Sequence, residues 1–266
     1  MNKKVLICGA TGFIGRNAAE YFENLDGYEV YAVGFKRSLS NWPKNRFFKA
    51  DLTSGEEVSK LFQKHKFDIV LQAAATTSGA RDIVERPYIH VTNNAVMNSL
   101  ILQACYDYNV GHFLFLSCGV MYNPDRSPVS EADFFIEEDI FHKYYGIGWT
   151  KVYIEKMCEF YANLGRTRHT VMRLSNAYGP YDKYDLERSH FFGATITKVM
   201  NSEKEIVVWG DGKTERDLLH VDDVISFIQG AIEKQEDKYK LYNVGYGESF
   251  SVKQIVQKII EASEKE

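Results

Sequence analysis

The chain has 266 residues, 45% of them apolar and 26% charged, which is an ordinary balance for a globular protein of one large domain or two small ones. The 32 lysines and arginines against 36 aspartates and glutamates give a net charge of −4. This balance argues against general nucleic-acid binding and against electrostatic docking on anionic lipid, because both need clustered positive charge. Tyrosine is frequent, with 17 residues.

The first apolar run of the chain is too short for the core of a signal peptide. Only the four residues Val5–Cys8 stand between the basic start and Gly9, and no window of 18 consecutive apolar residues occurs. We therefore expect a first β-strand here and no transmembrane helix. The four cysteines form no CxxC pair and no metal-ligand spacing, so we expect reduced thiols in a cytoplasmic protein and no metal site.

The first 175 residues alternate between continuous apolar runs and amphipathic stretches. Strands that are apolar throughout are typical of a parallel sheet covered on both faces. We therefore predict an α/β fold with a doubly wound parallel sheet, the Rossmann fold, for residues 1–175. The expected strands are Val5–Cys8, Tyr28–Val33, Phe47–Ala50, Asp68–Ala75, His112–Leu116 and His169–Leu174, and the expected helices are Ile14–Leu25, Glu56–His65, Pro87–Asn109 and Thr150–Leu164.

The pattern changes after residue 175. Loop residues such as Gly179-Pro180 and the stretch 210–212 interrupt the chain, and the later segments alternate less regularly. We expect residues 176–266 to form mainly a smaller C-terminal substrate-binding cap, with residues 221–245 packing back on the core. The expected elements are helices at Phe192–Asn201, Val221–Glu233 and from Val252 onward, and strands at Ile206–Trp209 and Tyr242–Val244.

Three glycines follow the first expected strand and open the first expected helix. Gly9, Gly12 and Gly15 follow the spacing i, i+3, i+6. The first allows a tight turn, the second lets a pyrophosphate approach the backbone, and the third permits close helix–strand packing, while the helix N-terminus points its N–H groups at the anion. An ordinary glycine turn is the alternative. We predict that this loop binds a dinucleotide through Gly9, Thr11, Gly12, Phe13, Ile14 and Gly15.

The end of the second expected strand carries cations where an NAD site carries an acid. Lys36 and Arg37 suit the 2′-phosphate of NADP. A solvated loop with incidental charge is the alternative. We predict NADP as the cofactor, with NAD as the other possibility. The other expected cofactor contacts are Asp51 and Leu52, which would bracket the adenine, and the small residues Ala73, Ala74 and Ala75, which would let the cofactor lie close to the backbone.

The order of these motifs resembles the extended short-chain dehydrogenase/reductases, the family of nucleotide-sugar epimerases, dehydratases and reductases. Within it, the motifs look most like those of the GDP-L-fucose synthases, which are NADPH-dependent epimerase–reductases. The resemblance covers nearly the whole chain. It is carried by the glycine loop, Asp51-Leu52, Ala73–Ala75, Leu114–Ser117, Asn176–Pro180, Ser189-His190, Val207–Gly212 and Arg216–Asp223.

The resemblance implies roles for single residues of this chain. Lys151 would hold the nicotinamide ribose and lower the pKa of a catalytic tyrosine, and His190 would be an acid in epimerisation, with a structural histidine as the alternative. The resemblance also implies a homodimer formed through the helices near 93–108 and 150–164. The nucleotide-sugar substrate would be bound by Asn176, and its diphosphate part by Lys198, Trp209 and Arg216, with a core position as the alternative for Trp209.

The catalytic Tyr-x-x-x-Lys pair of the family is broken in this chain. Ile147 stands four residues before Lys151, and no Tyr-x-x-x-Lys occurs between the fifth and sixth expected strands. Three interpretations remain: Tyr144 or Tyr145 supplies the phenol from outside the helix, the phenol is absent, or the aligned lysine is wrong. We favour the first, with Tyr145 ahead of Tyr144. It requires the two glycines that follow Tyr145 to bulge the helix or to delay its start.

The residue that orients the sugar oxygen also departs from the family pattern. The family has Ser or Thr four residues before Tyr122, where this chain has Cys118, a poor hydrogen-bond donor, so Ser117 is the alternative. The epimerising cysteine of the fucose synthase pattern is replaced by Val120, which puts double epimerisation in doubt. The Asp-Glu pair of the sugar dehydratases is replaced by Gly119 and Val120, which argues against a dehydratase.

These observations predict an NADP-dependent nucleotide-sugar reductase or epimerase that acts at a sugar carbon, carbon 4, of a nucleoside-diphosphate sugar, with a GDP-sugar preferred. A cofactor-recycling 4-epimerase and a non-catalytic NADP-binding or sensing protein are the alternatives. The family usually continues for several dozen residues past the last expected helix, so we also expect the cap to lack its last segment.

Overall fold

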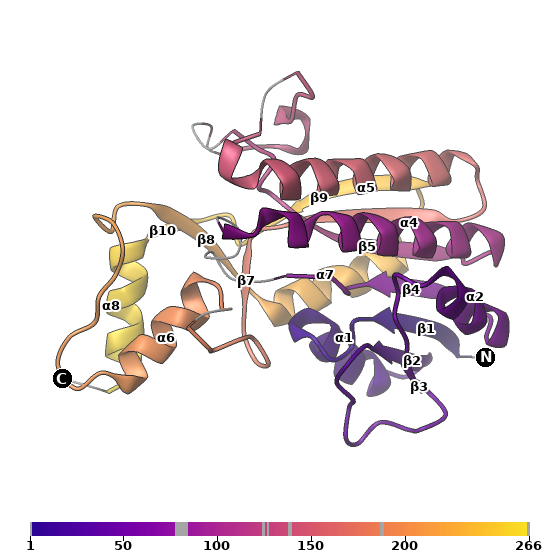
Figure 1. Cartoon of the computed structure of the whole chain (residues 1–266), viewed down its shortest axis with the longest axis horizontal. Coiled ribbons are helices and arrows are strands. Elements are labelled where there is room, and N and C mark those ends of the chain that lie inside the picture. The colour runs from indigo at the N-terminus through magenta and orange to yellow at the C-terminus, as the bar shows by residue number, and fades with distance from the viewer. Residues whose placement is uncertain are drawn as a thin grey trace.

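The larger sheet of the protein has seven strands that all pair in parallel, in the order β3-β2-β1-β4-β5-β6-β9 (Figure 1). The structure is a computed structural model, and it describes residues 2–77, 85–123, 126, 128–137, 140–186 and 189–264. The strand order reverses between β1 and β4, which is the point where doubly wound sheets bind their ligands. The strands are β1 (Lys3–Cys8), β2 (Tyr28–Gly34), β3 (Phe47–Lys49), β4 (Ile69–Gln72), β5 (His112–Cys118), β6 (Arg168–Leu174) and β9 (Tyr239–Val244).

Helices cover both faces of this sheet. The helices α2 (Gly55–Lys64), α4 (Thr92–Asp107) and α5 (Tyr145–Asn163) share one hydrophobic cluster with the sheet, and α1 (Phe13–Glu23) and α7 (Val221–Lys234) share the other. Alternate residues of β1 explain why the run is apolar throughout: Leu6 faces the first cluster and Ile7 the second. The predicted doubly wound α/β fold is therefore confirmed.

The predicted helix at Pro87–Asn109 is divided in the structure. A short 3₁₀ helix, η1 (Pro87–His90), precedes α4, which begins only at Thr92. Two further 3₁₀ helices, η2 (Glu131–Asp133) and η3 (His142–Tyr144), lie in the long connection between β5 and α5. Among the described residues, no helix is long and apolar enough to cross a membrane.

A second, three-stranded sheet in the order β10-β8-β7 lies beside the first, with two helices (Figure 1). The segment 221–245 returns to the larger sheet, because α7 packs on α1 and β9 pairs with β6. The elements of this smaller part are β7 (Asn176–Tyr178), α6 (Phe191–Asn201), β8 (Glu215–His220), β10 (Ser249–Ser251) and α8 (Val252–Ala262).

The predicted strand at Ile206–Trp209 is wrong. This stretch has no regular structure, and Val207 and Trp209 are 71% and 83% exposed, so their apolar side chains mark an open pocket and not a strand in a sheet. The three strands of the smaller sheet were not predicted. They are short or rich in polar residues, as in Glu215-Arg216-Asp217 of β8, so they lack the apolar runs that indicate buried strands.

Candidate active site

The glycine loop after β1 is packed so tightly that side chains would not fit. Gly9 has a φ of 76°, and a Cβ added to it would lie 2.6 Å from Cα of Ala74. A Cβ on Gly15 would lie 2.3 Å from the carbonyl oxygen of Gly9. Gly12 is the N-cap of α1 and has no side chain to cap the first N–H groups. This loop, Gly9–Gly15, whose three glycines leave the backbone uncovered at a helix N-terminus, forms a cradle that fits the pyrophosphate of a dinucleotide. We call it the bare glycine cradle.

The residues after β2 and β3 lie beside this loop at the carboxyl end of the sheet. Lys36 and Arg37 follow β2, one residue after its end, and are exposed. Asp51 already accepts hydrogen bonds from the backbone N–H and the hydroxyl of Thr53, at 2.9 and 2.7 Å, and Leu52 is buried in the core. The five remaining expected contacts of the loop and of the end of β4 are partly buried or exposed: Thr11, Phe13, Ile14 and Ala73 are partly buried, and Ala75 is exposed.

Lys151 reaches from α5 to the end of β5. Its ammonium donates a 2.7 Å hydrogen bond to the carbonyl oxygen of Leu116 and lies 4.6 Å from the ring centre of Phe115. Burial of the amine lowers the pKa of Lys151. Burial also raises the pKa of the nearby Cys118 thiol, and the positive charge of Lys151 opposes that rise. The structure thus brings Lys151 and Cys118 together at the carboxyl end of β5.

Ser117, the alternative to Cys118, is committed to another partner. It is 4% exposed, and its hydroxyl donates a 2.5 Å hydrogen bond to Glu155 of α5. Glu155 also forms a 2.6 Å ion pair with Arg173 of β6, and both side chains are almost fully buried. Glu155 and Arg173 were not predicted from the sequence. The detectable feature was a charged residue, Arg173, next to the apolar pair Val171-Met172 in an expected buried strand.

The two candidate tyrosines are consecutive residues at the start of α5, where Tyr144 is the N-cap and Tyr145 is the first helical residue. The helix begins at Tyr145, so the expected bulge or delayed start is wrong: Gly146 and Gly148 are regular helical positions. Tyr145 precedes Lys151 by six residues, about 1.7 turns, which turns its side chain away from the lysine. Tyr145 is 55% exposed, with its ring beside Trp149.

Tyr144 is placed differently. It is the last residue of η3 and the N-cap of α5, with a φ of −107° and a ψ of 8°, so it lies just outside the helix. It packs against the buried cluster of Met121, Ile140 and Val152. Ile147, at the position of the family's tyrosine, is partly buried. The packing of Tyr144 against this buried cluster, compared with the exposure of Tyr145, favours Tyr144 over Tyr145, which reverses the preference from the sequence.

His190 is the N-cap residue of α6. Although the residue is exposed overall, neighbouring protein atoms desolvate its imidazole and lower the pKa of His190, and the charge of Asp182 opposes this effect. The same desolvation raises the pKa of Asp182. Asp182 and His190 therefore influence each other's charge at the loop that leads into the cap.

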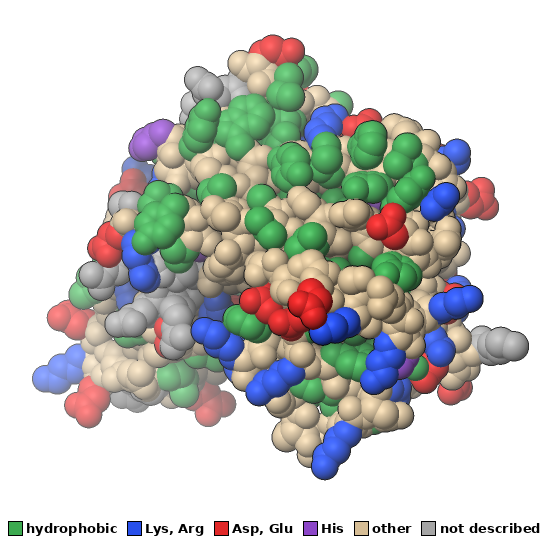
Figure 2. Space-filling model, turned by 45° about the vertical axis from the view of Figure 1, so that its right-hand side comes forward, with side chains coloured by type: hydrophobic (Ala, Val, Ile, Leu, Met, Phe, Trp, Pro, Cys, Tyr) green, Lys and Arg blue, Asp and Glu red, His purple; other side chains and the backbone are tan. Residues whose placement is uncertain are grey.

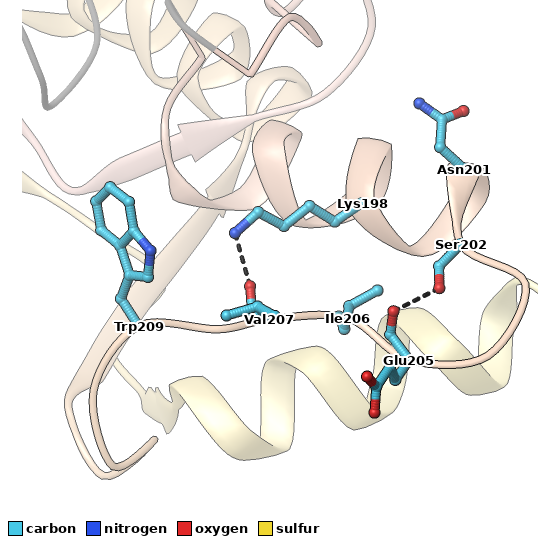
Figure 3. A pocket seen from close by; sticks show the side chains of 7 residues that line it. All are labelled: Lys198, Asn201, Ser202, Glu205, Ile206, Val207 and Trp209. Atoms are coloured by element: carbon cyan, nitrogen blue, oxygen red, sulfur yellow. Dashed lines mark hydrogen bonds between the residues drawn. The ribbon is translucent and has the colours of Figure 1, made fainter.

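A pocket of about 310 Å³ opens between α6 and the stretch after it (Figure 3). Lys198 points across it and donates a 2.7 Å hydrogen bond to the carbonyl oxygen of Val207. The ammonium lies 5.8 Å from the ring centre of Trp209, whose indole stands at the open side. The predicted pair Lys198 and Trp209 therefore shares one pocket, and Trp209 is exposed and does not occupy the core.

The other two predicted substrate residues lie on one face of the smaller sheet. The register pairs Asn176 with Leu218 and Arg216 with Phe250, so Asn176, Arg216 and Phe250 project to the same side. Phe250 was not predicted, and its ring is 6.5 Å from that of the exposed Tyr246. The adjacent Asp217 accepts hydrogen bonds from Ser175 and from two backbone N–H groups of the loop at 246–247, which fixes this loop.

A dinucleotide cradle at the switch point of a doubly wound sheet, with a buried lysine at the end of β5, defines an NAD(P)-binding enzyme of the extended short-chain type. The model of the NAD dependent epimerase/dehydratase family matches residues 5–245, and the chain belongs to this family. The predicted family, the enzyme class and an NAD(P) cofactor are thereby confirmed.

Named relatives show the range of this family. GDP-L-colitose synthase of Yersinia pseudotuberculosis is 24% identical over 94% of this chain and 78% of its own length. GDP-L-fucose synthase of Azorhizobium caulinodans is 26% identical over 94% of this chain and 77% of its own length.

Solved structures give the same result for the fold. UDP-glucose 4-epimerase of Thermotoga maritima, solved with UDP-glucose, has a TM-score of 0.84 and 26% identity, and the match covers 99% of this chain and 84% of that one. A GDP-D-glycero-L-gluco-heptose synthase of Campylobacter jejuni, solved in the presence of NADPH, has a TM-score of 0.84 at 20% identity, over 100% of this chain and 87% of that one. The second likeness shows the fold alone.

Proposed function

We propose that the protein is an NADP-dependent reductase or epimerase that acts at carbon 4 of a nucleoside-diphosphate sugar, with a GDP-sugar preferred. The observation that carries the proposal is the position of Lys151 and Cys118 at the carboxyl end of β5, on the same edge of the sheet as the bare glycine cradle. Substrate and cofactor meet at this edge in doubly wound sheets.

The cofactor would be held by the glycine loop, with Lys36 and Arg37 as partners of a 2′-phosphate. When bound there, NADPH supplies the hydride for the sugar carbon. The phenol of Tyr144 donates the proton to the sugar oxygen, and the ammonium of Lys151 favours the phenolate that remains. The protonated thiol of Cys118 orients the same oxygen. In epimerisation, His190 supplies the acid.

The substrate end of the site consists of cations and aromatic rings. Lys198 and Arg216 provide positive charge for a diphosphate, and Asn176 provides an amide on the same sheet face as Arg216. The exposed indole of Trp209 suits stacking on a large purine base. The names of the relatives that make GDP-L-colitose and GDP-L-fucose agree with a guanine nucleotide.

The test uses the purified protein, NADPH and a GDP-4-keto-6-deoxy sugar. Loss of NADPH absorbance together with a reduced sugar product supports the reductase. Interconversion of two C4 epimers of a GDP-sugar without net NADPH loss supports the 4-epimerase, which recycles its cofactor. If neither occurs with GDP-, UDP- or dTDP-linked sugars while NADPH binds, the proposed activity is wrong and a non-catalytic binding role replaces it.

We further propose a homodimer in the cytoplasm. Apolar side chains of α4 and α5 are exposed, among them Val96, Tyr153 and Phe160, which are 40%, 44% and 52% accessible. Figure 2 shows hydrophobic side chains gathered on the upper part of the face it presents, where Figure 1 places α5 and α4. Pairing of these two helices with their copies would cover this surface. The four cysteines are all free thiols, which agrees with a reducing compartment.

A further inference from the structure

At the reacting end of β5, two residues of α5 that lie one turn apart are hydrogen-bonded to consecutive residues of the strand. Lys151 donates to the carbonyl of Leu116, and Glu155, one turn later, accepts from the hydroxyl of Ser117. The next strand residue is Cys118. The position of the thiol relative to the lysine is therefore set by two hydrogen bonds from adjacent turns of one helix.

Both carboxylate oxygens of the buried Glu155 accept hydrogen bonds. One carboxylate oxygen accepts from Ser117 at 2.5 Å and from Nε of Arg173 at 3.2 Å, and the other accepts from Nε at 3.2 Å and from Nη2 at 2.6 Å. The exposed fractions of the two charged side chains are 3% and 4%. Such a pair persists in a dry interior only when its hydrogen bonds are complete.

Arg173 is held from its other side as well. Its Nη1 donates a 2.7 Å hydrogen bond to the hydroxyl of Tyr122, which in turn donates to Oδ1 of Asn243 on β9. The guanidinium is thereby fixed between Glu155 and the turn that follows β5. Because Glu155 is neutralised by Arg173, the ammonium of Lys151 bonds to a neutral carbonyl and forms no ion pair with the carboxylate one turn away.

We propose that Glu155 is a positioning residue of the active site: with Arg173 as its counter-charge, it fixes the end of β5 through Ser117 and leaves the charge of Lys151 available to the reacting groups. Glu155 itself does not touch the substrate. Its importance for turnover rests on the proposed function, whereas its effect on the site can be measured without any sugar.

The charged groups that act on Cys118 are Lys151 and Glu155 from α5 and Arg173 from β6. The carboxylate of Glu155 raises the pKa of the Cys118 thiol, and the two cations lower it. Cys118 is also the least buried of the four cysteines, since the other three are fully buried. The rate at which iodoacetamide alkylates Cys118, followed by mass spectrometry against pH, therefore reports the charge balance of the site.

Glu155→Gln keeps an acceptor for Ser117 but leaves Arg173 uncompensated. We expect the alkylation profile of Cys118 to shift down by about one pH unit. Arg173→Met removes the cation instead and should not shift the profile down. Glu159→Gln, which removes the same charge one turn further along α5 at the surface, is the matched control and should leave the profile unchanged.

Ser117→Ala removes the hydrogen bond to Glu155 without changing any charge, so it tests the positioning of the strand end alone. It also replaces Glu155→Gln as the test if that variant does not fold. It should raise the alkylation rate several-fold at every pH without moving the profile along the pH axis. The inference is overturned if Glu155→Gln and Arg173→Met both shift the profile down, because a general loss of packing around Cys118 would have the same effect in both variants. It is also overturned if folded Glu155→Gln shows no shift, or if Ser117→Ala changes nothing. If the alkylation of Cys118 behaves as expected but no sugar is turned over, the result counts against the proposed function and not against this inference.

Discussion

Gly9 and Ala74 approach so closely that the Cα of Ala74 occupies the space a Cβ on Gly9 would need, at 2.6 Å. This contact joins the turn after β1 to the end of β4, and it brings two stretches of the predicted cofactor site together. Gly9 also needs its positive φ of 76°, which L side chains rarely adopt. The glycine therefore serves both backbone shape and packing.

Gly9→Ala should lower the free energy of unfolding by about 3 kcal/mol, because backbone strain and a clash with main-chain atoms add. Gly27→Ala is the matched control: its φ is 89°, but a Cβ there would meet open space. It should cost only about 1 kcal/mol from strain. Urea unfolding of both variants measures the difference, and equal losses would contradict the steric part of the argument.

The two cations after β2 provide a test of cofactor preference. The double variant Lys36→Ala/Arg37→Ala should weaken NADPH binding roughly 10- to 100-fold, since it removes charged partners of the 2′-phosphate, and should leave NADH binding nearly unchanged. Lys44→Ala, an exposed lysine of the same loop, is the control. Titration with both dinucleotides measures the ratio, and an equal loss for NADH would show that the cations do not select NADP.

The larger sheet could be predicted because its strands are buried on both faces, which makes them apolar throughout. The glycine loop could be predicted because its spacing has one steric purpose. The smaller sheet could not be predicted, since strands such as Glu215–His220 carry polar residues on both faces and so show neither an apolar run nor an alternating pattern. The ion pair of Glu155 and Arg173 was equally hidden, because the two residues come from separate elements and only the packing of α5 on β6 joins them.

The surroundings of Tyr144 and Tyr145 at the start of α5 favour Tyr144 as the proton donor, and the sequence left the start of the helix open because glycine is compatible with both a helix and a turn. With the helix starting at Tyr145, we expect Tyr144→Phe to lower kcat by about 100-fold or more with little change in KM, as loss of a general acid does. Tyr145→Phe should stay within about two-fold of the unmodified enzyme. Steady-state kinetics decide between them, and the opposite result would restore Tyr145 as the donor.

If the apolar surface of α4 and α5 forms the dimer interface, a charged side chain placed in it should weaken the dimer. Phe160→Glu should convert a dimer into a monomer, because an unpaired carboxylate would be buried at the interface. Met200→Glu, on α6 and 53% exposed, is the control for a charge on an apolar surface position elsewhere. Light scattering after gel filtration gives the mass. A monomeric unmodified protein, or a Phe160→Glu variant that remains dimeric, would contradict the α4–α5 interface.

Two buried histidines make stability depend on pH. Burial lowers the pKa of His112 to about 3 and that of His169 to about 4, from the ordinary value of 6.5. His169 is fully buried, and neither of its ring nitrogens has a hydrogen-bond partner within the described part of the chain. Both imidazoles therefore stay neutral in the folded protein at pH values where the unfolded chain takes up a proton.

Because the unfolded state binds more protons below pH 6.5, the contribution of each histidine is complete above that pH and is lost as the pH falls toward the folded pKa. For His169 the loss between pH 7 and pH 5 is about 2 kcal/mol. His169→Phe, which keeps the ring contact with Phe113, should reduce the pH dependence of the free energy of unfolding by that amount. His142→Gln, at an exposed position, should leave the dependence unchanged. Urea unfolding at pH 5, 6 and 7 measures the slope. An undiminished slope in His169→Phe would mean that other groups cause the acid sensitivity.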